Sequence, residues 1–193
     1  MKGENMTQLI VPSNQSLGEE ISNAISHGLG ALFSIAATVL MIVYACINHK
    51  PASTIVSVSV YGAALIILYL TSCIYHALKL NKGKKVFQIL DHCMIFVLIV
   101  GTYTPVCLSI IGGPLGYSIL GINLICMIAG ITLNAINLKK WHKVSLVLYI
   151  IMGWSILLGG FKVFSIIPLF GWSMLLLGGV FYPAGIIFSR NKK

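Results

Sequence analysis

Three polar residues with the chemistry for hydrolysis stand close together in a strongly apolar chain. Ser72 and His76 end a long apolar run, and Asp91 is the only acidic residue between Ile21 and the C-terminus. Ser72 and His76 are one helical turn apart, so they share a helix face. A histidine and a carboxylate on neighbouring helices suit a zinc site in which the aspartate holds or activates a water. His76 is therefore a candidate metal ligand, and Asp91 and Ser72 are candidate catalytic residues.

The same residues also allow a purely structural interpretation. A Ser–His–Asp hydrogen-bond network between helices would hold the helices together without any chemistry. One histidine does not make a zinc site, because zinc takes three or four protein ligands. Against this, a central aspartate costs about 2.5 to 3.5 kcal/mol on membrane-insertion scales, which makes such groups functional candidates. The residues alone leave both interpretations open.

The elements that position these residues are membrane spans. The chain of 193 residues is 58% hydrophobic and only 9% charged, whereas soluble domains average about 25% charged residues. The first 22 residues are polar and contain no apolar segment of a cleavable signal peptide. In a membrane protein, an excess of basic residues marks the loops that face the cytoplasm, so the net charge of +9 does not indicate nucleic-acid binding. We expect membrane lipids and no nucleic acid as partners.

Charged residues, glycines and prolines interrupt the apolar sequence and divide it into six expected helices. The expected spans are residues 22–46, 53–78, 87–110, 115–137, 144–161 and 165–188. The connections are too short for a soluble domain, which predicts one all-α polytopic bundle. Residues 1–21 are the expected cytoplasmic N-terminal segment and residues 189–193 a basic cytoplasmic tail.

Lysine and arginine predict the orientation of this bundle. Lys50 and Lys162 lie on one side of the expected membrane. The other eleven of the 13 basic residues lie on the opposite side: Lys2, Lys79, Lys82, Lys84, Lys85, Lys139, Lys140, Lys143, Arg190, Lys192 and Lys193. Because cytoplasmic loops carry the excess of basic residues, both termini are expected in the cytoplasm.

With this orientation, the inner ends of the first three spans converge on one leaflet. Glu20, Asn23 and His27 share one face of the first span, by their i, i+3, i+7 spacing. They lie at the same depth as the end of the second span, with His76, and the start of the third, with Asp91. The other histidines are weaker candidates. His92 is expected at a polar helix interface, and His49 and His142 in solvated loops beside lysines.

Taken together, these segments resemble the hemolysin III family, the bacterial branch of the progestin and adiponectin receptor superfamily. The resemblance rests on Glu20-x-x-Asn23-x-x-Ser26-His27-Gly28, on Ser72-x-x-x-His76, and on Asp91-His92. It continues through "GTYTP" (residues 101–105), "YIIMGW" (149–154) and "GGVFYPAG" (178–185). The order and spacing of these motifs cover nearly the whole chain.

The resemblance implies a seven-helix bundle in the bacterial plasma membrane that binds zinc near the cytoplasmic face. His76 would be one of three histidine ligands, and an HxxxH motif opening a seventh helix would supply the others. Asp91 would position the metal-bound water, with Ser72 beside the site. Similarity to ceramidase-type membrane hydrolases further implies zinc-dependent hydrolysis of an amide or ester in a lipid-like substrate.

The sequence departs from this pattern in one respect, because it contains no HxxxH. We therefore expect the first six helices of the seven-helix architecture, one of the three zinc ligands, and no turnover by this chain alone. A cytolytic, pore-forming protein and a non-catalytic regulator of membrane state are the alternative functions. The residues specify neither the substrate nor the oligomeric state.

Overall fold

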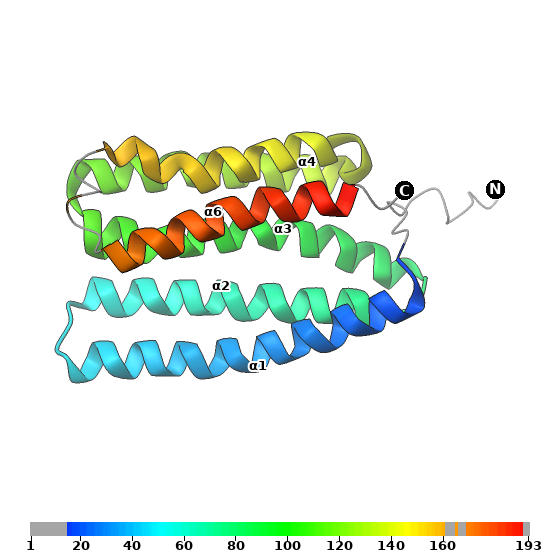
Figure 1. The fold of residues 1–193 in the computed structure, drawn as a ribbon, viewed down its shortest axis with the longest axis horizontal. Coiled ribbons are helices and arrows are strands. Elements are labelled where there is room, and N and C mark those ends of the chain that lie inside the picture. The colour runs from blue at the N-terminus through cyan, green and yellow to red at the C-terminus, as the bar shows by residue number, and fades with distance from the viewer. Residues whose placement is uncertain (1–14, 161–164, 166–168, 191–193) are drawn as a thin grey trace.

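The protein is a bundle of long helices. The computed structural model describes residues 15–160, 165 and 169–190, and the part of the chain that it describes contains no strand. The α-helices are α1 (Leu17–Ile47), α2 (Ala52–Ala77), α3 (Lys82–Pro105), α4 (Gly113–Trp154) and α6 (Leu169–Arg190). Each of α1, α2 and α3 packs against the next helix in the chain, as Figure 1 shows. The all-α prediction is confirmed.

Capping chemistry places the start of α1. Ser16 Oγ accepts a hydrogen bond from the Glu19 backbone N–H (3.3 Å), and the Glu19 carboxylate accepts one from the Ser16 backbone N–H (2.8 Å). This reciprocal pair is a capping box, which satisfies two N–H groups that the helix itself leaves unbonded. Helix α1 therefore begins at Leu17, earlier than the apolar run from residue 22 indicates. Glu20 is consequently helical, in the first turn of α1.

Helix α4 contains a sharp break that divides its 42 residues in two. Asn137 has extended backbone angles (φ −161°, ψ 91°) between two helical stretches. Its Oδ1 accepts a hydrogen bond from the Lys140 backbone N–H at 3.0 Å, as the N-cap of a new helix does. The chain therefore reverses at residue 137, where the fourth span was expected to end, but residues 138–143 are helical and not the loop that was expected.

The two halves of α4 lie side by side and run in opposite directions. Asn123 Nδ2 donates to Ser155 Oγ at 2.7 Å across 32 residues, and Ser145 Oγ donates to Asn134 Oδ1 at 2.6 Å. A straight helix would separate such residues by ~1.5 Å per residue, so the chain must turn back between them. Figure 1 shows this hairpin along one side of the bundle.

A second irregularity follows "GTYTP" at the end of α3. Tyr103, within this motif, contacts the end of α4. Pro105 ends α3 and is followed by a π-helix over Val106–Ile111; proline lacks the N–H that would continue the regular pattern. At its other end, α4 passes into a 3-10 helix over Ser155–Gly159. The Tyr103 hydroxyl donates to Gly153 O and accepts from Ile156 N–H, both at 2.9 Å. It thereby satisfies backbone groups beside the transition between α4 and the 3-10 helix.

Four of the described helices are long and apolar enough to cross a membrane, where six spans were expected. They are Leu17–Ile47, Ala52–Ala77, Lys82–Ile111 and Gly113–Gly159. The last has 47 residues, about 70 Å of helix against a hydrocarbon core of about 30 Å, and it is folded back on itself. A shorter apolar stretch covers Leu169–Phe181. Residues 1–14, the expected end of the fifth span at residue 161, and the tail beyond residue 190 lie outside the described residues.

Candidate functional site

Three helix ends meet at one carboxylate. Glu20, in the first turn of α1, accepts from His76 in the last turn of α2 and from Lys84 in the first turn of α3. Its Oε2 lies 3.0 Å from His76 Nδ1 and 2.9 Å from Lys84 Nζ. We call Glu20, His76 and Lys84 the inner-end cluster.

The inner-end cluster is largely shielded from solvent. The side chains of Lys84, His76 and Glu20 are 6%, 9% and 13% exposed. Lys84 Nζ also donates to Leu78 O at 3.0 Å and lies 5.2 Å from the centre of the Tyr75 ring. A lysine is almost never this buried without a partner, so Glu20 and the end of α2 together stabilise its charge. The cluster thus connects all three helix ends.

Glu20 also fixes the orientation of the His76 ring. A carboxylate accepts hydrogen bonds, so the Nδ1 atom at 3.0 Å carries the proton and Nε2 remains as the basic nitrogen. Histidines that ligate metals are oriented in this way by a carboxylate on the other ring nitrogen. The arrangement equally suits a histidine that exchanges protons.

His27 lies beside this cluster. The His27 ring stands edge-on to His76 with 5.7 Å between ring centroids, and to Tyr69 with 5.8 Å. Asp91 and His76 both act electrostatically on His27. The shared face of Glu20 and His27, inferred from their spacing, therefore does point toward His76.

The candidate residues among the described part of the chain do not form a complete metal site. Ser72 is 2% exposed, one turn before His76, and Asp91 is half-buried. Among the described residues, no group of three or more His, Cys, Asp or Glu side chains is arranged to hold a metal ion. Because zinc requires three or four protein ligands, the described residues do not by themselves hold this metal.

Sequence reasoning missed Lys84, which it counted only as a topology signal. Lys84, Gln88 and Asp91 have the i, i+4, i+7 spacing of one helix face, and this was the available signal. On that face, Gln88 Nε2 also donates to the Tyr75 hydroxyl at 3.1 Å. Polar contacts between α2 and α3 therefore continue one turn deeper than the lysine.

Of the other three histidines, two lie as expected and one does not. His49 is exposed, in the turn after α1. The prediction of a solvated loop for His142 is wrong: it is helical and half-buried, with its ring centroid 5.9 Å from that of His92. His92 lies at the interface between α3 and α4, as expected, where its carbonyl accepts from the Tyr149 hydroxyl at 2.6 Å.

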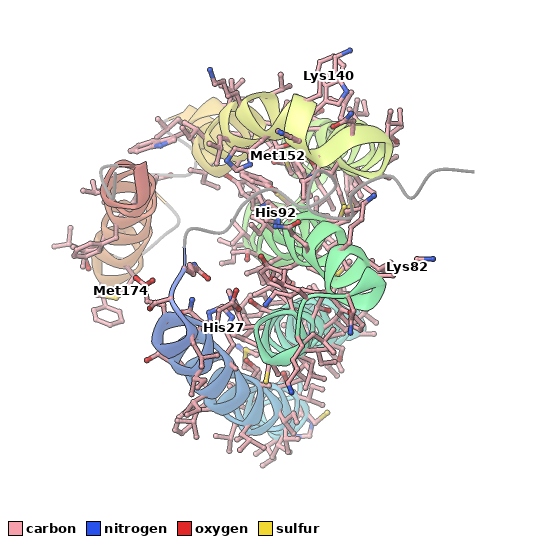
Figure 2. All side chains as sticks on the ribbon, turned by 90° about the vertical axis from the view of Figure 1, so that its right-hand side faces the viewer. His27, Lys82, His92, Lys140, Met152 and Met174 are labelled. Carbon is pink, nitrogen blue, oxygen red and sulfur yellow. The ribbon has the colours of Figure 1, made fainter. Side chains whose placement is uncertain are left out.

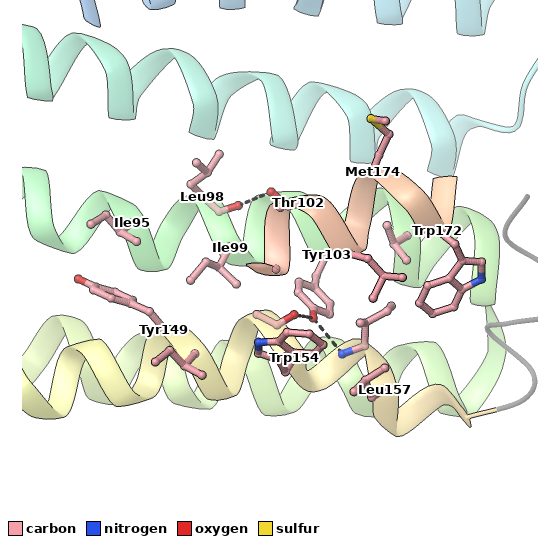
Figure 3. Close-up of a pocket in the computed structure, with 17 residues that line it drawn as sticks. Ile95, Leu98, Ile99, Thr102, Tyr103, Tyr149, Trp154, Leu157, Trp172 and Met174 are labelled. Carbon is pink, nitrogen blue, oxygen red and sulfur yellow. Dashed lines mark hydrogen bonds between the residues drawn. The ribbon is translucent and has the colours of Figure 1, made fainter. Parts of the chain in front are cut away.

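An apolar cavity of about 440 Å³ lies between α3, the second half of α4 and α6. Figure 3 shows its lining of aliphatic and aromatic side chains, among them Tyr103, Trp154 and Trp172. Ile95 is the first residue of α3 on this lining. It follows Asp91 by one helical turn, so the carboxylate and the cavity share one face of α3.

Comparison with known proteins agrees with the motifs. The family described as Haemolysin-III related matches residues 15–191. The chain belongs to the hemolysin III family. It is 40% identical to Hemolysin-3 of Bacillus cereus over 95% of this chain and 83% of that protein. It is 38% identical to the Hemolysin-3 homolog of Bacillus subtilis (strain 168) over 92% of this chain and 83% of that protein.

No solved structure matches the chain. Membership of the hemolysin III family, together with the apolar helices, makes this chain a multi-pass membrane protein.

Proposed function

We propose that this protein crosses the bacterial plasma membrane six times with both termini in the cytoplasm. The two halves of α4 are two of these crossings, and α6 is the last. We further propose that the inner-end cluster belongs to a site for zinc-dependent hydrolysis of an amide or ester bond in a lipid-like substrate. The contact of Glu20 with both His76 and Lys84 carries this proposal, because it gathers three helix ends around one oriented imidazole.

Each residue has a specific role in the proposed site. His76 is the ligand that this chain supplies, with Nε2 available because Glu20 holds Nδ1. Asp91 is the general base, and Ser72 supports the site from the turn before His76. When bound in a complete site of this kind, zinc polarises the substrate carbonyl and activates a water at neutral pH.

The apolar cavity supports a lipid-like substrate. Its volume of about 440 Å³ falls within the range of small-molecule pockets, about 300–1,000 Å³. Because Asp91 and Ile95 share a face of α3, a substrate with its reactive bond at Asp91 could extend an acyl chain along the helix into the cavity. A polar reaction centre next to an apolar binding region matches the two halves of a lipid.

In the proposed zinc site, this chain supplies fewer ligands than the metal requires. The sequence has no HxxxH, and the described residues bring only one of the three histidines of the family pattern to the cluster. A lone histidine competes poorly with chelators for zinc. We therefore expect residues 1–193 alone to bind zinc weakly and to show no turnover.

The test is an assay of the purified chain in detergent micelles, with and without added Zn²⁺. Fluorescent lipids with either an amide-linked or an ester-linked acyl chain serve as substrates, and released fatty acid is measured. The expected result is a rate equal to that of protein-free micelles. Zinc-dependent release that disappears in Asp91→Asn but persists in His49→Ala would show that this chain alone has a complete site.

The names of the relatives favour membrane permeabilisation as a second candidate function. Both are called Hemolysin-3 proteins, and this chain could share a cytolytic activity. Vesicles loaded with a self-quenched dye distinguish the two candidates. Leakage caused equally by wild type, His76→Ala and Asp91→Asn would support permeabilisation independent of the inner-end cluster, whereas no leakage would exclude it.

A further inference from the structure

Five lysines lie at the end of the bundle where α4 reverses. Two are in the first turn of α3, and three are in the first turns of the second half of α4. We call these five residues the basic rim: Lys82, Lys85, Lys139, Lys140 and Lys143. All are exposed except Lys85, which is half-buried. Figure 2 shows Lys82 and Lys140 extending away from the bundle at this end.

The described part of the protein leaves the charge of the basic rim uncompensated. Among the described residues, no carboxylate lies within ion-pair distance of these five lysines. The first turn of a helix favours acidic residues, because its unbonded N–H groups carry a partial positive charge. Helix α1 follows this rule with Glu19 and Glu20, whereas α3 has no acidic residue in its first turn, and residues 138–143 include none. An anion from outside the chain would therefore be stabilised here.

The spacing of the lysines concentrates this charge on one side of each helix. Lys82 and Lys85 are three residues apart, and Lys139 and Lys143 are four apart, so each pair shares a helix face. Like charges at this spacing repel each other. A negatively charged group that contacts both lysines of a pair would replace this repulsion by attraction.

In the proposed topology, the reversal of α4 lies at the membrane surface. Residues 113–136 form about 36 Å of helix, slightly more than the hydrocarbon core of about 30 Å. A crossing that begins at Gly113 therefore ends close to Asn137, where the chain reverses. This places the lysines that follow Asn137 at the level of the lipid headgroups.

Trp141 lies among these lysines and is typical of the same level of the membrane. Tryptophan is enriched where the hydrocarbon core meets the headgroups, because its ring is apolar and its N–H is polar. The Trp141 side chain is half-buried, and the Lys140 ammonium lies 4.9 Å from the centre of its ring. This cation–π contact holds the Lys140 charge beside the ring, at the depth where lipid phosphates lie.

We propose that the basic rim binds anionic phospholipid headgroups of the surrounding leaflet in preference to zwitterionic ones. Both kinds of headgroup contain a phosphate, but a zwitterionic headgroup also carries a cation, which the lysines repel. Anionic lipid at the rim stabilises the starts of α3 and of the second half of α4. The interaction involves neither His76 nor a metal ion, and it rests only on the proposed crossing of the membrane by the two halves of α4.

The experiment measures quenching of Trp141 fluorescence in lipid nanodiscs. A Trp154→Phe/Trp172→Phe background leaves Trp141 as the only tryptophan of the full chain. The quencher is either phosphatidylglycerol or phosphatidylcholine with brominated acyl chains, mixed into the other lipid without label. Because each lysine at an anionic surface contributes about a fivefold preference, phosphatidylglycerol should be favoured at Trp141 by at least about fivefold at low ionic strength. In about 1 M salt, where the Debye length is only about 3 Å, the preference should nearly disappear.

Matched variants assign the preference to the basic rim. The triple variant Lys139→Gln/Lys140→Gln/Lys143→Gln should lose most of it. Lys50→Gln, at the opposite end of the bundle, and the charge-preserving Lys140→Arg should retain it. Thermal unfolding of the chain with all three tryptophans is an independent measurement: a larger fraction of phosphatidylglycerol should raise the Tm of the wild type and of Lys50→Gln, but not that of the triple variant.

Equal quenching by the two lipids, with no dependence of the wild-type Tm on phosphatidylglycerol, would overturn the proposal. So would a preference that the triple variant retains in full. Displacement of the labelled lipid by soluble glycerol phosphate would assign the rim to a soluble phosphate compound instead. Quenching by neither lipid would place Trp141 away from the bilayer, and would contradict the proposed topology as well.

Discussion

At the residue scale, Glu20 connects the ends of three helices, α1, α2 and α3. Its one carboxylate accepts from a histidine and a buried lysine on two other helices. The sequence predicted that Glu20 and His27 would share a face toward His76, because helical spacing determines which residues align. The spacing within α3 places Lys84 on the same face as Asp91. It does not predict that Lys84 is buried, because this depends on how closely α2 and α3 approach each other.

A double-mutant cycle tests the pairing of Glu20 with Lys84. Glu20→Gln leaves the lysine charge buried without its anion, which should lower the unfolding free energy by about 3–5 kcal/mol. Lys84→Met removes that charge and should cost less. We expect the double variant to be more stable than the sum of the single losses predicts, measured by denaturant unfolding in micelles.

The control for this cycle is Lys79→Met, at an exposed lysine just before the turn. It should change the unfolding free energy by no more than about 0.5 kcal/mol. Strictly additive losses for Glu20→Gln and Lys84→Met would contradict the ion pair.

At the scale of elements, hydropathy predicted where helices exist, but local hydrogen bonds decide where they begin and break. The capping box of Ser16 and Glu19 extends α1 beyond its apolar run. Asn137 reverses α4 with a single extended residue and then caps the next helix. The lysines after Asn137 resembled a loop in the sequence, yet exposed lysines are also good helix formers.

Tyr103→Phe tests the connection between α3 and the end of α4. Removal of the hydroxyl leaves the Ile156 N–H without the partner that it has at 2.9 Å and also frees Gly153 O. We expect the free energy of unfolding to fall by about 2 kcal/mol, measured by thermal or denaturant unfolding. Tyr117→Phe, at a tyrosine that is 63% exposed, is the matched control and should have almost no effect. Equal effects at the two positions would exclude a bridging role for Tyr103.

Gly130→Ala tests the close approach of α4 to α3. A Cβ at Gly130 would fall on the ring of Phe96, which is fully buried, so this variant should lose about 1–3 kcal/mol of stability. Gly121→Ala adds the same methyl group in the same helix with nothing within 4 Å. It should instead be neutral or more stable by up to about 1 kcal/mol. The reverse ranking in unfolding experiments would mean that α3 and α4 do not pack as described.

At the scale of the whole molecule, the uneven distribution of basic residues between the two sides of the membrane predicts that both termini are cytoplasmic. Single cysteines in a background without the five native ones can be labelled in intact cells with a membrane-impermeant maleimide. We expect Lys50→Cys to react from outside, whereas Lys82→Cys and Lys140→Cys should react only after permeabilisation. Figure 2 shows Lys82 and Lys140 at the same end of the bundle. Labelling of only one of them from outside would contradict an even number of crossings between them.

The sequence could predict the family, the all-helical bundle and the meeting of three helix ends, because these depend on composition, motif order and helical spacing. It could not predict that the reversal within α4 takes a single extended residue, Asn137, nor the cavity or the contact of His92 with His142. These depend on the distances between helices that are remote in the sequence.

The proposed hydrolytic site requires that His76 in the inner-end cluster serves as one ligand of a zinc ion. The most direct measurement is the zinc content of a chimera in which an HxxxH helix from a hemolysin III family member follows Lys193. After dialysis against a weak chelator, the chimera should retain one zinc ion per chain, His76→Ala should remove it, and Lys79→Ala should not. Zinc retained in full without His76 would contradict the account.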